Sequence, residues 1–117
     1  MSATGQGHPV LKRLRETALA ALEERRGLVI YARIDAQEMD RMARQIEREA
    51  IEKIRAALPD DVDLPELAGV RNRLARMDEQ LRALDARTEI SDRSRALERD
   101  DITWRAFEDV VWLLGID

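Results

Sequence analysis

The residue types that most often carry out chemistry in proteins are scarce in this chain. It has no cysteine, which excludes disulfides, thiolate catalysis and cysteine-held zinc. No glutamate precedes the single histidine, His8, so the Glu-x-x-His motif of carboxylate-bridged metal bundles cannot form. Asp60, Asp61 and Asp63 cluster between two prolines, but their spacing is not that of a calcium loop. We therefore expect a solvated acidic loop there and no metal site.

Sequence patterns of nucleophilic and phosphate-binding sites are missing as well. No Gly-x-Ser-x-Gly turn occurs, and the glycines are scattered singly. Residues 69–74, Gly-Val-Arg-Asn-Arg-Leu, resemble the arginine–asparagine segment of helical ribonucleases of the HEPN class. That segment is followed by a histidine in the family, whereas Arg76 and Met77 stand at the corresponding place here. We expect no enzymatic activity and no cofactor.

Composition predicts long helices that carry many charges. Charged residues make up 38% of the 117 residues and aromatic residues only 3%, with 5 glycines and 3 prolines to form turns. The 20 basic and 24 acidic residues give a net charge of −4, which disfavours binding to nucleic acid by overall charge. Apolar runs are too short to cross a membrane, and no secretory signal pattern is present. We expect a cytoplasmic protein that does not bind membranes.

The predicted fold is all-α: a long-helix bundle or a coiled-coil-like homodimer, with at most one short strand at residues 28–34. Pro9 suits the first position of a helix, and Pro59 and Pro65 bound a loop. Asp35, with Glu38 three residues later, matches a helix-starting capping pattern with an acidic cap in place of Ser or Thr. Residues 88–101 are almost wholly polar. These boundaries predict a flexible tail over residues 1–8 and a helical core over residues 9–87. A polar linker over residues 88–100 and a C-terminal aromatic helix over residues 101–117 are expected to follow.

Two helices carry apolar residues at heptad spacing, which is typical of helix–helix interfaces. We call these two sets the alanine seam, within residues 36–58, and the leucine seam, within residues 67–84. We expect a homodimer that forms through one or both seams, although the same pattern also fits the core of a monomeric bundle. The predicted contact residues are Ala36, Met39, Ala43, Ile46 and Ala50 in the alanine seam, and Leu67, Val70, Leu74, Met77, Leu81 and Leu84 in the leucine seam.

Residues 28–34, Leu-Val-Ile-Tyr-Ala-Arg-Ile, fit either a helix or a short strand. Followed by Asp35 and an amphipathic helix, they resemble the opening of ribbon-helix-helix DNA-binding proteins. The resemblance implies that two strands pair across a dimer and present Val29, Tyr31 and Arg33 to the major groove. In that family the first helix breaks early, whereas the pattern here continues without interruption to Leu58. A DNA-binding regulator is therefore the alternative function.

The last helix carries one tryptophan that its apolar arc does not include. Trp104, Phe107 and Leu114 share one side of the helix, and Trp112 lies about 100° away among charged residues. Tryptophan is enriched at the centres of protein interfaces. We expect a non-enzymatic adaptor or regulatory protein that acts through a dimeric helical scaffold and this aromatic helix. Trp112 is predicted to contact another protein or the second protomer, although it could instead fold back onto its own helices.

Overall fold

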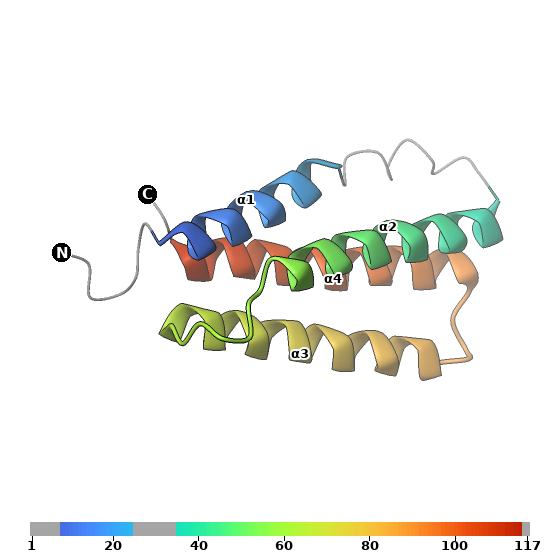
Figure 1. Cartoon of the computed structure of the whole chain (residues 1–117). Coiled ribbons are helices and arrows are strands. Elements are labelled where there is room, and N and C mark those ends of the chain that lie inside the picture. Colours follow the sequence, from blue (N-terminus) through green and yellow to red (C-terminus); the bar gives the residue numbers. More distant parts are fainter. Residues whose placement is uncertain (1–7, 25–34, 116–117) are drawn as a thin grey trace.

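Four helices make up the fold in the computed structural model, which describes residues 8–24 and 35–115 (Figure 1). They are α1 (Pro9–Glu24), α2 (Ala36–Ala56), α3 (Pro65–Ala86) and α4 (Asp92–Leu114). Successive helices run in opposite directions, and the start of α1 and the end of α4 lie at the same end of the bundle. The expectation of an all-α bundle is confirmed for the described residues, which contain no strand.

The first two helices begin at residues that satisfy free backbone donors. At α1, the backbone N–H of Val10 donates to His8 Nδ1 over 3.1 Å. At α2, the side chain of Asp35 accepts from the backbone N–H of Gln37 over 3.3 Å, as the predicted acidic cap requires. The other half of the predicted capping motif, Glu38, instead pairs with Arg41 one turn later.

The third helix begins at Pro65, the residue expected to bound the preceding loop, and proline at the first helical position loses no helical hydrogen bond. The predicted loop between Pro59 and Pro65 is present. Its Pro59 carbonyl accepts a hydrogen bond from the Arg71 guanidinium, which ties the loop to α3. Arg71 lies in the segment that resembles HEPN ribonucleases, and this contact gives it a structural role.

The prediction of a polar linker over residues 88–100 is wrong for most of that range, because α4 begins at Asp92 rather than near residue 101. Ser91 caps the helix by accepting from the backbone N–H of Ser94 over 3.1 Å. Within the polar segment, Ala96 and Arg99 are buried. A stretch with few apolar residues thus folds as helix because it is capped and because its inward side meets α2 and α3.

Helix α4 is the centre of the bundle. It packs against α1, α2 and α3, whereas α2 and α3 scarcely approach each other. The core that surrounds it contains Trp104 and Phe107, whose rings meet edge to face at 5.2 Å. Because α4 lies behind the gap between α2 and α3, a groove is left on that side of the bundle, with α4 as its floor.

No helix in the described part of the chain is both long enough and apolar enough to cross a membrane. Residues 1–7 of the expected tail and residues 28–34 lie outside the described residues. The choice between helix and strand for residues 28–34 therefore stays open.

Candidate functional site

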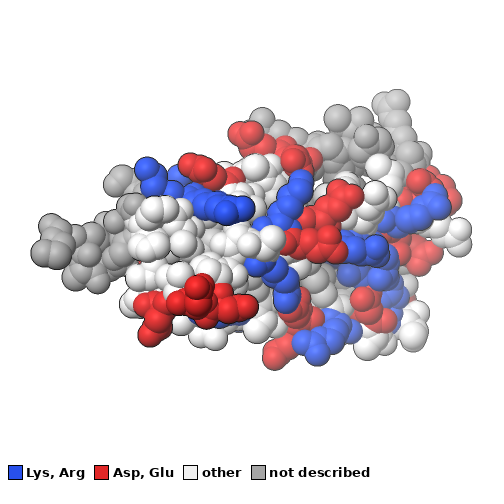
Figure 2. Space-filling view, viewed as in Figure 1, with Lys and Arg blue, Asp and Glu red and all other residues white. Residues whose placement is uncertain are grey.

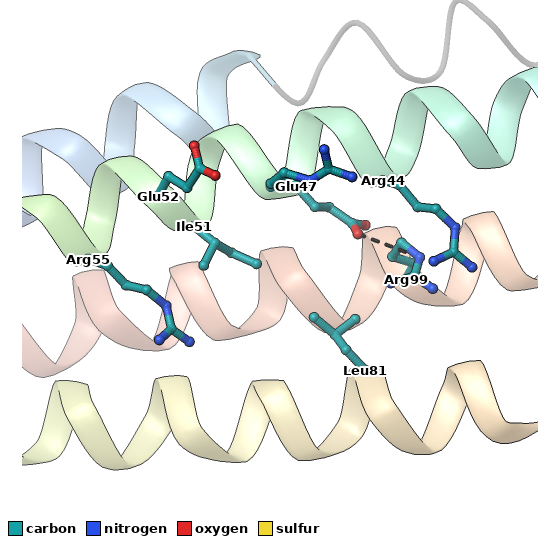
Figure 3. Close-up of a pocket in the computed structure, with 8 residues that line it drawn as sticks. Arg44, Glu47, Ile51, Glu52, Arg55, Leu81 and Arg99 are labelled. Atoms are coloured by element: carbon teal, nitrogen blue, oxygen red, sulfur yellow. Dashed lines mark ion pairs between the residues drawn. The ribbon is translucent and has the colours of Figure 1, made fainter.

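Charged side chains from α2 and α4 line the groove between α2 and α3 (Figure 3). Its volume is about 400 Å³. Apolar walls come from Ile51 on α2 and Leu81 on α3, and α4 contributes Arg99 from below. The remaining lining residues all lie on α2 and are charged: Arg44, Glu47, Arg48, Glu52 and Arg55.

At the floor of this groove, Arg99 and Glu47 form a buried ion pair. Arg99 Nε lies 3.7 Å from Glu47 Oε2, and only 5% of Arg99 and 4% of Glu47 are exposed. That separation is too long for a hydrogen bond. Accordingly, Arg99 Nε and Glu47 Oε1 make no hydrogen bond with any described residue. The two side chains therefore lie side by side in the core while part of their hydrogen-bonding capacity stays unused.

Two ion pairs bridge the groove from α2 to α3, one on each side of the buried pair along α2. Arg44 Nη2 lies 3.0 Å from Asp85 Oδ1, and Arg55 pairs with Asp78. Asp85 also accepts a hydrogen bond from Arg99, so one carboxylate joins α2, α3 and α4. Helices that scarcely touch along their backbones are thus held together by arginine side chains.

Burial raises the pKa of Glu47 to about 9. The nearby Asp100 carboxylate acts in the same direction, while the positive charges of Arg99 and Arg44 lower the pKa without cancelling the effect of burial. Burial therefore favours the protonated, neutral form of Glu47 over the carboxylate form that would attract Arg99 by charge. The groove as a whole supplies no nucleophile beside a base. Nor does any group of three or more potential ligands in the described part of the chain have the geometry to hold a metal ion.

A second hollow lies on another side of α3, where α3 meets the end of α4. Its volume is about 270 Å³, and its rim carries Trp112 and Leu113. Trp112 is 83% exposed, and Leu113 is 42% exposed, its methyl groups reaching Gly69 on α3. An ion pair of 2.6 Å between Arg73 and Asp109 joins the two helices. We call this region, with Asn72 and Arg76, the Trp112 surface.

No family model matches the chain, and neither the curated proteins nor the solved structures gave a significant match.

One chain by itself covers both predicted seams. Met39, Ala43 and Ala50 of the alanine seam are buried, as are Leu67, Val70, Leu74, Met77 and Leu84 of the leucine seam. Ala36, Ile46 and Leu81 are partly buried. No second chain is needed to remove these side chains from water, and the homodimer stays a prediction.

Charged residues that flank the leucine seam on α3 find partners within one chain. Arg73 pairs with Asp109 of α4, and Asp78 pairs with Arg55 of α2. Helix α2 runs without a break, unlike the first helix of ribbon-helix-helix proteins. The residues predicted to contact DNA, Val29, Tyr31 and Arg33, lie outside the described residues.

Sequence reasoning missed Glu47 and Arg99, although a signal was present. Glu47 lies on the same helical stripe as Met39, Ala43, Ala50 and Ile54, and Arg99 lies on the stripe that contains Ala96, Thr103 and Ala106. A charged residue that replaces an apolar one on a stripe at three- and four-residue spacing is the mark of a buried ion pair.

Proposed function

We propose that this chain is a non-enzymatic interaction module that binds another protein chain through the Trp112 surface. The observation that carries the proposal is the 83% exposure of Trp112 on a helix whose other tryptophan, Trp104, is 1% exposed. The core is complete without Trp112, which leaves a large apolar side chain in water. Such side chains are concentrated at interface centres because they bury a large area at a small entropic cost.

The shape and chemistry around Trp112 support this proposal. An indole beside a hollow offers both a protruding group and a receiving site, and Leu113 extends the apolar area. Polar and charged side chains, Asn72, Arg73, Arg76 and Asp109, surround it. An apolar centre with a polar rim is the common arrangement of protein interfaces.

The other charge-rich region is a poorer candidate for binding. In the α2–α3 groove, Arg44, Arg55 and Arg99 are already paired with carboxylates of this chain. Basic and acidic groups are also interspersed over the face of the molecule seen in Figure 2. That distribution differs from the basic surface that contact with phosphate groups requires.

Site-specific photo-cross-linking tests the proposal. A photoreactive amino acid placed at position 112 is expected to give covalent adducts with a protein chain in the cells that make this protein. The matched control is position 97, because Leu97 is 53% exposed on the same helix and does not line the hollow. Adducts at position 112 that are absent at position 97 support the proposal. Absence of adducts at position 112, or equal labelling at both positions, would overturn it.

A further inference from the structure

We infer that the protein bound by the Trp112 surface is a second copy of this chain, joined through a two-fold axis. The inference rests on the proposed function and adds the identity of the partner. A two-fold interface uses the same surface on both chains, so that surface must be complementary to itself in shape and in charge.

The shape condition is met because a knob and a hole lie on one surface. Trp112 projects from the rim of a hollow of about 270 Å³ whose lining includes Gly69 and Asn72 of α3. Gly69 has no side chain, and only the methyl groups of Leu113 come within 4 Å of the place where a Cβ would be. A two-fold rotation would bring Trp112 of each chain to the hollow of the other, so that two indoles leave water together.

The charge condition is met because the two helices that border the hollow offer opposite charges. Arg76 of α3 and Glu108 of α4 are both exposed, and neither makes an ion pair or hydrogen bond with a described residue. Glu108 lies one helical turn before Trp112. Arg73 and Asp109, which also lie there, neutralise each other.

A surface with one free charge of each sign and no net charge matches its own copy. Across a two-fold axis, Arg76 of each chain would face Glu108 of the other, giving two equivalent ion pairs. A strongly acidic or strongly basic partner would instead require an excess of one sign around the hollow.

A charge-exchange experiment tests the inference. The mass of the full chain is measured by sedimentation equilibrium over a range of concentrations. We expect a monomer–dimer equilibrium for the wild type. For Arg76→Glu and for Glu108→Arg, the dissociation constant of the dimer should rise by about tenfold or more, because each change creates two like-charge contacts across the axis. The double variant Arg76→Glu/Glu108→Arg restores opposite charges and is expected to recover the wild-type equilibrium to within about threefold.

Arg48→Glu is the matched control. Arg48 is also an exposed arginine that forms no ion pair with a described residue, but it lies on α2, away from the hollow. It is expected to leave the dimer unchanged. A wild-type chain that stays monomeric at all concentrations would overturn the inference, as would a dimer that responds equally to Arg48→Glu and Arg76→Glu. If the chain is monomeric but position 112 still cross-links to a different protein, the proposed function stands and only the second copy is excluded.

Discussion

Arg99 of α4 and Glu47 of α2 form an ion pair with 3.7 Å between Nε and Oε2, in a position almost closed to water. Both residues lie on the inward stripes of helices that pack side by side and run in the same direction. Asp85 of α3 completes the arrangement by accepting a hydrogen bond from Arg99. One arginine therefore links three helices at the centre of a groove that their backbones leave open.

The pH dependence of stability should report on Glu47. Its pKa is about 9 in the folded chain and near 4.5 when exposed, so between these values the folded state holds a proton that the unfolded state has lost. The free energy of unfolding should therefore fall as pH rises through this window, by at most about 1.4 kcal/mol per pH unit. Glu47→Gln keeps the side chain's size and cannot ionise.

Urea unfolding of both proteins across the pH range between these two pKa values measures this effect. The wild type should lose stability relative to Glu47→Gln as pH rises. Parallel profiles for the two proteins would show that Glu47 ionises in the folded chain as it does in water.

Removing Arg99 alone should lower the free energy of unfolding more than replacing both Arg99 and Glu47 with apolar residues. In Arg99→Met, the buried carboxyl group of Glu47 loses its polar neighbour, and the expected loss of stability is about 1–3 kcal/mol, the cost of a buried polar group without a partner. Glu47→Leu should cost less, because Arg99 keeps Asp85 as a partner. The double variant Glu47→Leu/Arg99→Met should be more stable than Arg99→Met alone, since apolar side chains of similar volume can replace a buried ion pair. A double-mutant cycle by urea unfolding checks this order, which additive effects of the two changes would contradict.

The leucine seam should matter for folding rather than for association. Leu74 is 4% exposed and belongs to the core of one chain. Leu74→Ala is expected to lower the free energy of unfolding by about 2–5 kcal/mol through the lost burial and the cavity that remains. Its mass under native conditions should equal that of the wild type. Leu97→Ala, at an exposed leucine, is the control and should change stability by less than about 0.5 kcal/mol. A changed mass of Leu74→Ala with unchanged stability would instead indicate that the leucine seam is a dimer interface.

The sequence predicted the helices well where local rules decide them. Pro9, Asp35 and Pro65 mark helix starts by backbone chemistry, and the apolar periodicity of residues 67–84 identifies the inward face of α3. Which surface would cover each seam was not predictable, because heptad spacing is the same whether the partner helix belongs to the same chain or to another.

The start of helix α4 shows where reasoning from composition fails. Residues 92–100 contain few apolar side chains, so their polarity indicated a linker. They are helical because Ser91 caps them and because Arg99 finds carboxylate partners in the buried Glu47 of α2 and the exposed Asp85 of α3. The helical stripe indicates that Arg99 is buried, but partners 52 and 14 residues away in the sequence cannot be identified from a local pattern.

The measurement that most directly tests the separation between core and binding surface is urea unfolding of two variants of the same helix. Trp112→Ala and Trp104→Ala are compared with the wild type at a concentration low enough for each to be monomeric. Trp112→Ala should leave the free energy of unfolding within about 0.5 kcal/mol of the wild-type value, whereas Trp104→Ala should lower it by about 3–5 kcal/mol. A loss of about 2 kcal/mol or more in Trp112→Ala would contradict this expectation and place Trp112 in the core of its own chain.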